Sequence, residues 1–267
     1  MRKEILTLVI AVALASACSD GDSNGPGSAV TIKFGTPGST ASPAASFSVV
    51  GGAAPQDLSI TGTNGTLAIS DIRLIVEEFE LEPVEVAECD VEPEPASCAD
   101  FEQRYFFINV PLDAAPVTVV AADIPAGMYD ELEFEVDDVE IDADDPEEAA
   151  DAALIQTLFT TVRAAFSDWP EKASMVVVGT FTPTGGDAIP YRTYFEAEIE
   201  VELEFTTPLV VTEQMSDSFV VELSPQMWFV RADGTVWDLS EFDFATTQEL
   251  IEFELEIEDG FDLEIET

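Results

Sequence analysis

Strict alternation of apolar residues with glutamates is the feature that most constrains the fold of this chain. In the segment YFEAEIEVELEF, residues 194–205, every second residue is apolar, and the residues between them are Glu196, Glu198, Glu200, Glu202 and Glu204. Successive side chains of a β-strand point to opposite faces, so this pattern predicts a strand with one face in a core and the other in water. The same alternation recurs over residues 131–136 and 251–257. We therefore expect a mainly β protein.

Two alternating segments change phase along the chain. In TLAISDIRLIVEEFELE, residues 66–82, the apolar positions shift twice, and after Val136 they continue at Val139 and Ile141. The second shift predicts a β-bulge at Asp137-Asp138. Further strands are expected near residues 30–34, 45–50, 104–110, 116–121, 174–182, 209–213 and 218–223, with Gly185-Gly186 as a hairpin turn.

One segment follows a helical repeat instead. Asp145 is a predicted N-cap, Pro146 occupies the first helical position, and Glu148 lies three residues after the cap. Apolar residues then recur at helical spacing at Leu154, Leu158, Val162 and Phe166. The sequence predicts an antiparallel β-sandwich with one packed α-helix over about residues 146–167.

The N-terminus has the proportions of an export signal. A basic start, Met1-Arg2-Lys3, precedes the thirteen residues from Ile5 to Ala17, which are mostly apolar, whereas a membrane-spanning helix needs roughly 20 residues. Leu14-Ala15-Ser16-Ala17 followed by Cys18 resembles the lipobox of bacterial lipoproteins, in which the cysteine is lipidated and becomes the first mature residue. This resemblance implies a signal peptide over residues 1–17 and lipidation of Cys18. The alternative is an ordinary secretory signal that is cut near Ala17 and leaves a free thiol.

The polar, glycine-rich residues 18–28 are expected to form a flexible tether between the lipid and a β-sandwich domain over residues 29–267. The whole chain has 55 acidic and 9 basic residues. Without residues 1–17 it retains 54 acidic and 7 basic residues, a net charge of −47. This charge disfavours nucleic acid and anionic lipid as ligands. Salt screens repulsion between carboxylates, so the acidity fits either a saline habitat or ion binding.

Two cysteines remain after Cys18. Cys89 and Cys98 have eight residues between them in ECDVEPEPASCADF, and an even pair in an exported protein predicts a disulfide. In the chain-entropy model, a short loop closed in this way contributes roughly 2.5–3 kcal/mol.

Several short segments resemble a group of uncharacterised bacterial lipoproteins of the β-sandwich type that carry a domain of unknown function. They are residues 66–82, the cysteine pair, INVPL, IPAGMYDELEFEV and MWFVRADGTVWDL, which together cover roughly residues 64–240. The resemblance implies a β-sandwich lipoprotein of a diderm bacterium, in the outer membrane and facing the periplasm or the cell surface, with no assigned activity. In these segments Gly127 is expected at a positive φ and Asp233-Gly234 in a hairpin turn.

The chemistry open to the chain is carboxylate chemistry. It contains no histidine, which excludes Ser-His-Asp and Cys-His catalysis and imidazole-based metal sites. A carboxylate hydrolase would need one acidic pair, and no pair is distinguished among so many, so we predict no catalytic residue. Calcium is the one cofactor that the pattern suggests, because its preferred ligands are carboxylate oxygens. Its candidate ligands precede the predicted helix: Asp137, Asp138, Asp142, Asp144 and Asp145. The alternative is that Asp145 caps the helix and the others are exposed acids.

Aromatic residues near the C-terminus allow two interpretations. Trp228, Phe229 and Trp237 are suited to stacking on a sugar or, as is more common beside a hairpin, to core packing. We therefore predict a lipid-anchored, non-enzymatic binding or structural module of the bacterial cell envelope. Its partners would be the membrane, through the anchor, and an envelope protein or glycan, but not nucleic acid. A calcium-dependent adhesion or carbohydrate-binding domain is the alternative, and a hydrolase is less favoured.

Overall fold

The computed structural model describes residues 28–35, 57–84, 98, 100–110, 112, 117–139, 146–212, 218–222, 225–258 and 264–266. For residues 28–35, 117–123, 146–150, 206, 218–222, 256–258 and 264–266 it describes the backbone alone. The predicted strand at residues 45–50 lies outside this part of the chain, as do Cys18 and Cys89.

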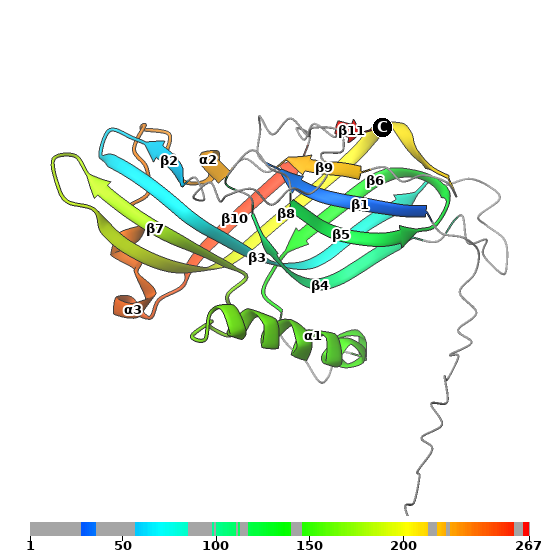
Figure 1. Ribbon diagram of the computed structural model, residues 1–267, viewed down its shortest axis with the longest axis horizontal. Helices are drawn as coiled ribbons and strands as arrows, with labels where there is room; N and C mark the ends of the chain where they lie inside the picture. Colours follow the sequence, from blue (N-terminus) through cyan, green and yellow to red (C-terminus); the bar gives the residue numbers. More distant parts are fainter. Residues whose placement is uncertain are drawn as a thin grey trace, which may run out of the picture.

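The described chain is mainly β, as predicted, with one main helix, α1, at Pro146–Ala165 (Figure 1). The strands are β1 Ser28–Gly35, β2 Leu58–Thr61, β3 Gly65–Pro83, β4 Phe101–Asn109, β5 Val117–Ile124, β6 Gly127–Val136, β7 Met175–Pro183, β8 Ile189–Val211, β9 Ser218–Glu222, β10 Ile251–Glu258 and β11 Glu264–Glu266. The short helical elements are α2 Pro225–Trp228, η2 Leu239–Phe242 and α3 Phe244–Thr247. The strand predicted at 209–213 is the end of β8, which is continuous with the alternating segment 194–205.

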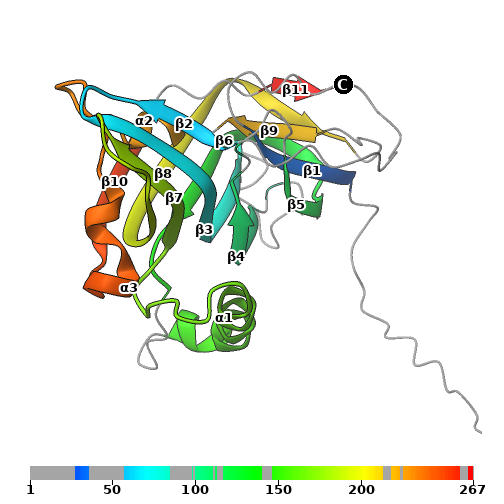
Figure 2. The ribbon, with the colours of Figure 1, turned by 60° about the vertical axis from the view of Figure 1, so that its left-hand side comes forward.

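The strands form two sheets. A four-stranded sheet has the order β11-β9-β1-β5, and a seven-stranded sheet contains β10, β8, β6, β3 and β2, with β4 and β7 also paired to it. Most pairings are antiparallel, but β10 runs parallel to β8 and β9 runs parallel to β1. The small sheet lies over one part of the large sheet. Helix α1 lies beside another part of the large sheet, away from the small sheet (Figures 1 and 2). Among the described helices, none combines the length and the apolar character needed to cross a membrane.

The large sheet forks between its two longest strands. β6 pairs with β3 from Glu78 to Pro83, whereas β7 pairs with β3 from Gly65 to Leu74. On the other side, β6 and β7 also pair with separate parts of β8. β6 and β7 therefore lie end to end between β3 and β8. The chain leaves the sheet after Val136, forms α1, and returns at Met175; we call this opening the fork.

Each face of the large sheet contributes to a separate core. The larger core includes Val76, Phe79 and Val136, together with Ile124 of β5. The smaller core joins α1 to the opposite face, and its buried members are Ile75, Tyr105, Val139, Ile155, Leu158, Val162, Trp169, Ala173, Val176 and Tyr194. Both phase shifts of β3 lie within the larger core, which contains Ile69 and Ile72 as well as Val76 and Phe79. The first of them coincides with a shift in the register of β3 with β7 between Ile69 and Asp71.

Two local predictions are corrected by the structure. The expected bulge at Asp137-Asp138 is wrong: β6 ends at Val136, and Val139 is buried in the core beneath α1, so the phase shift marks a change of core. Gly127 does not have a positive φ, because it begins β6 in an extended conformation; the described glycines with positive φ are Gly185 and Gly234.

The other two turn predictions are confirmed. Gly185 has a φ of 77° in the β7–β8 hairpin. Gly234 has a φ of 80° between Val230 and Val236, which form an antiparallel bridge. Both glycines adopt the left-handed backbone conformation, which residues with a Cβ atom rarely adopt.

The aromatic residues near the C-terminus pack into the fold. Trp228 and Phe229 are buried in the larger core, and Trp237 is partly buried against it. The Arg231 guanidinium lies 4.8 Å from the centroid of the Trp237 ring. Of the two interpretations, core packing is therefore the one that the structure supports.

Candidate functional site

Cross-strand register gathers glutamates from five strands onto one face of the large sheet. Glu102, Glu80, Glu133 and Glu202 form one row across β4, β3, β6 and β8. On β8 and β10, Glu196 pairs with Glu252 and Glu198 with Glu254. We call the following set the carboxylate face: Glu78, Glu80, Glu82, Glu102, Glu131, Glu133, Glu135, Glu196, Glu198, Glu200, Glu202, Glu204, Glu252 and Glu254.

The carboxylates of this face lie on directly paired residues, so they are closer to one another than charged groups scattered over a surface. Neighbouring strands are about 4.8 Å apart, and two unit charges at about 5 Å repel by about 0.8 kcal/mol in water. The repulsion is larger where the surroundings are less polar, and like charges directly opposite each other destabilise a strand pair. A cation bound to this face would relieve part of that repulsion.

At the fork, Ser174 forms hydrogen bonds with both β3 and β8. Its carbonyl accepts a 2.7 Å hydrogen bond from the Ile75 amide, and its amide donates to the Phe195 carbonyl at 3.0 Å. Its buried hydroxyl donates to the Ala197 carbonyl at 2.6 Å and accepts from the Ala197 amide at 2.7 Å. Ser174 therefore supplies partners for backbone groups that the diverging strands β6 and β7 do not reach.

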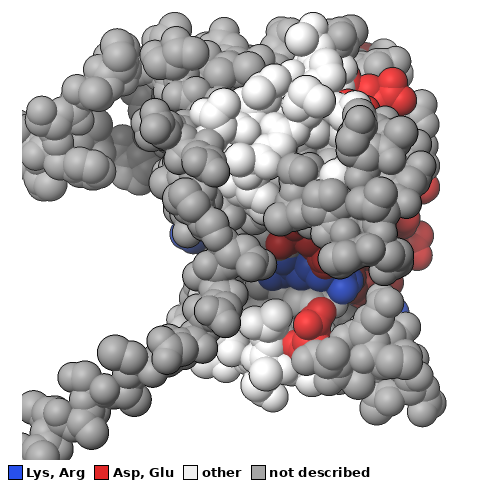
Figure 3. All heavy atoms as spheres, turned by 90° about the vertical axis from the view of Figure 1, so that its right-hand side faces the viewer, with Lys and Arg blue, Asp and Glu red and all other residues white. Residues whose placement is uncertain are grey.

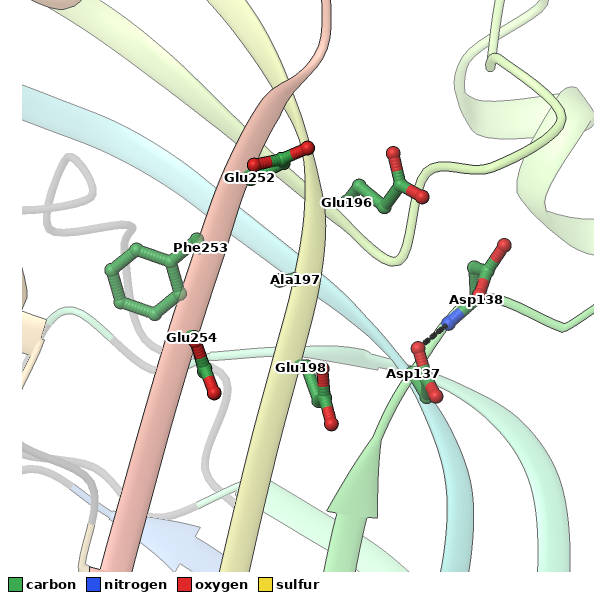
Figure 4. A pocket seen from close by; sticks show the side chains of 8 residues that line it. All are labelled: Asp137, Asp138, Glu196, Ala197, Glu198, Glu252, Phe253 and Glu254. Atoms are coloured by element: carbon green, nitrogen blue, oxygen red, sulfur yellow. Dashed lines mark hydrogen bonds between the residues drawn. The ribbon is translucent and has the colours of Figure 1, made fainter.

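A pocket of about 330 Å³ opens beside the fork. Its acidic lining comes from Asp137 and Asp138 after β6, Glu196 and Glu198 on β8, and Glu252 and Glu254 on β10. Figure 4 shows these carboxylates on one side of the sheet, while Phe253 points away from them. The Asp138 amide donates a 2.6 Å hydrogen bond to Asp137 Oδ1, which holds the two aspartates in the turn out of β6.

Asp137 also belongs to a second group of carboxylates on the β3 side of the fork. Oxygen atoms of Glu77, Glu135 and Asp137 all lie within 4.8 Å of one another, and all three residues are partly buried. Burial, together with the charges of Glu135 and Asp137, raises the pKa of Glu77 from 4.5 to about 7, although the nearby Arg104 opposes this shift. Near neutral pH the Glu77 carboxyl therefore changes between its protonated and its charged form.

Raised pKa values extend over the carboxylate face. Desolvation and a hydrogen bond with Glu78 raise the pKa of Glu80 to about 7. Desolvation and a hydrogen bond with Glu202 raise the pKa of Glu131 to about 7. The pKa values of Glu133 and Glu135 are raised as well, first by burial and then by neighbouring carboxylates. A further group of three close carboxylates, Glu80, Glu82 and Glu133, lies within this face.

Two basic side chains partly neutralise this region. Arg104 lies 3.2–3.6 Å from carboxylate oxygens of four residues, Glu77, Glu78, Glu102 and Asp151, and so links α1 to the sheet. Lys172 Nζ lies 3.5 Å from Glu196 and 3.9 Å from Asp138. On the side of the molecule shown in Figure 3, the visible basic atoms border acidic atoms.

The structure places two of the five predicted calcium ligands at the site. Asp137 and Asp138 line the pocket, while Asp142, Asp144 and Asp145 lie outside the described residues. The acids that complete the site, Glu77, Glu135, Glu196, Glu198, Glu252 and Glu254, were not among the predicted ligands. The alternating pattern placed most of them on an exposed strand face, but it carried no information about which strands are neighbours.

The predicted disulfide and the predicted lipidation involve three cysteines, of which the structure describes Cys98. Cys98 is buried, with 6% of its surface exposed. Cys89 and Cys18 lie outside the described residues, so the disulfide and the lipidation remain predictions.

The donor set of the fork fits a hard cation. Calcium takes six to eight oxygen ligands at about 2.3–2.6 Å and accepts carboxylates together with water. Glu77, Glu135 and Asp137 would supply up to six carboxylate oxygens, and the adjoining pocket has room for water. Compared with known protein families, curated proteins and solved structures, the chain shows no significant match.

Proposed function

We propose that this protein is a lipid-anchored, non-enzymatic binding module of the bacterial cell envelope that binds calcium at the fork of its large sheet. The observation that carries the proposal is the meeting of Glu77, Glu135 and Asp137 within 4.8 Å in partly buried positions beside the acidic pocket. The proposal joins the lipid-anchored module to the calcium cofactor that the sequence suggests; it keeps Asp137 of the predicted ligands and adds Glu77 and Glu135 of the sheet.

Electrostatics favour an ion at this position over a purely structural role for the carboxylates. Three acids held together in a partly buried site destabilise the fold when all are charged, and the raised pKa of Glu77 reflects this penalty. A divalent cation would remove the penalty and release the proton that Glu77 retains. The burial of Trp228 and Phe229 removes the main support for a sugar-stacking platform.

Calcium titration is the direct test. With the full chain in detergent at pH 7.5 and low ionic strength, we expect a binding heat and a rise in melting temperature. At 10 times the Kd, linkage contributes about 1.4 kcal/mol of stability, which corresponds to roughly 3–6 °C for a domain of this size. Calorimetry and thermal unfolding measure the two effects independently.

Matched variants separate binding from general screening. A Glu77→Gln, Asp137→Asn double variant should lose the calcium response and, because it removes repulsion, melt higher than the wild type without calcium. Asp187→Asn, which changes an exposed aspartate in the β7–β8 hairpin, should leave the response unchanged. The proposal is wrong if sodium chloride at equal ionic strength reproduces the whole stabilisation or if the double variant still binds.

The anchor is tested separately from calcium binding. A Cys18→Ala variant is expected to move from the membrane fraction to the soluble fraction, because it cannot receive the acyl chains that hold a lipoprotein in a bilayer. Metabolic labelling with a fatty acid should mark the wild type only. Equal labelling of the variant would show that Cys18 is not the lipidation site.

A further inference from the structure

The positively charged side chain of Lys172 lies at the edge of the pocket beside the fork. Lys172 Nζ lies 3.5 Å from Glu196 and 3.9 Å from Asp138, and both carboxylates line the pocket. The distances describe loose ion pairs, and 55% of the lysine side chain is exposed. Ion pairs at a protein surface contribute little to stability.

The backbone that carries Lys172 is fixed on both sides. The buried Trp169 indole donates a 2.7 Å hydrogen bond to the Ala173 carbonyl, and Ala173 itself is buried. Ser174 follows and is hydrogen-bonded to β3 and β8. The Lys172 backbone is therefore held beside the pocket while its flexible side chain can move, which keeps the effective concentration of the ammonium group high.

We infer that Lys172 is a tethered counter-ion of the pocket carboxylates Asp138 and Glu196, and that its positive charge opposes binding of a divalent cation at the adjoining calcium site and so lowers the calcium affinity of that site. This inference rests on the proposed function. Asp138 directly follows the ligand Asp137 and donates its amide to that side chain, so calcium bound there would repel the ammonium group, which would move away into solvent. The lysine weakens binding and also stabilises the cation-free fold.

The inference is tested by comparing calcium affinities in the full chain. Lys172→Met should lower the Kd for calcium about 3- to 10-fold, since the positive charge beside the site no longer opposes the cation. Lys172→Arg should stay within about twofold of the wild type, because it keeps the opposing charge. Arg231→Gln removes one positive charge from the hairpin that bonds to Thr63, roughly 40 Å along β3 from Glu77, and should have no effect.

A spectroscopic readout follows the lysine itself. The chain contains three lysines, Lys3, Lys33 and Lys172, so ¹³C-dimethylation of lysines, which keeps their charge, gives a spectrum with few signals. The signal that is missing in Lys172→Arg identifies Lys172. Calcium should shift this signal in step with the binding isotherm.

The outcomes distinguish the two proposals. If neither the wild type nor Lys172→Met binds calcium, the proposed function fails. If both bind with the same Kd, or if Lys172→Met binds more weakly, the opposing role of Lys172 is overturned while calcium binding stands. A Lys172 signal that stays constant during saturation also overturns it.

Discussion

The melting temperature of the cation-free protein is expected to fall as the pH rises from 5 to 8 at low ionic strength. The pKa of Glu77 is raised from 4.5 to about 7 in the folded state, mainly by burial, and Glu80 and Glu131 behave similarly. Between these values the folded state binds more protons than the unfolded state, so the free energy of unfolding decreases as the pH increases. Below about pH 4.5 these groups are protonated in both states, and above about pH 7 their effect is constant.

The size of this effect depends on screening. Solvent reduces the contribution of the more exposed glutamates, so we expect at least about 1 kcal/mol in total, or about 2–4 °C in melting temperature. Thermal unfolding across this pH range measures it. In 1 M sodium chloride, where the screening length is about 3 Å, the slope should become smaller. Glu77→Gln should reduce the slope further, and a stability that rises from pH 5 to 8 in the wild type would contradict the assignment.

Replacement of Trp169 by alanine is expected to lower the free energy of unfolding by about 3–5 kcal/mol. The indole is buried between the sheet and the end of α1, with ring centroids 5.2 Å from Tyr194, 5.5 Å from Phe107 and 5.9 Å from Phe166. The substitution creates a cavity, leaves the Ala173 carbonyl without this donor, and loosens the segment that carries Lys172. Urea unfolding at pH 7 measures the change.

An exposed residue of α1 provides the control for this variant. Leu154 is 54% exposed, so Leu154→Ala should change stability by less than about 0.5 kcal/mol. If Trp169→Ala loses less than 1 kcal/mol, α1 does not depend on this core for its attachment. Trp169→Ala should also weaken the effect of Lys172 on calcium affinity, since that effect requires a fixed backbone.

Much of the secondary structure follows from local patterns. Period-two alternation located β3, β6, β8 and β10, and capping residues with a helical repeat located α1 to within two residues of its observed end. The same patterns misassigned the phase shift after Val136. A bulge and a change from one core to another give the same apolar spacing, and only the position of α1 distinguishes them.

The candidate site was predictable only in part. Asp137 and Asp138 were identified because they follow a strand and precede a helix. Glu77 was not, because in sequence it is one glutamate among many. Its distinguishing properties, burial and proximity to Glu135 and Asp137, arise from pairing between strands that are more than fifty residues apart.

The sequence by itself determined that this chain forms amphipathic strands with a carboxylate side, because the direction of each side chain in a strand depends only on its position along the backbone. The tertiary structure alone decided which carboxylates meet, where the sheet divides, and that Lys172 lies beside the resulting pocket. Strand order and register are set by long-range burial of the apolar faces, which no local pattern records.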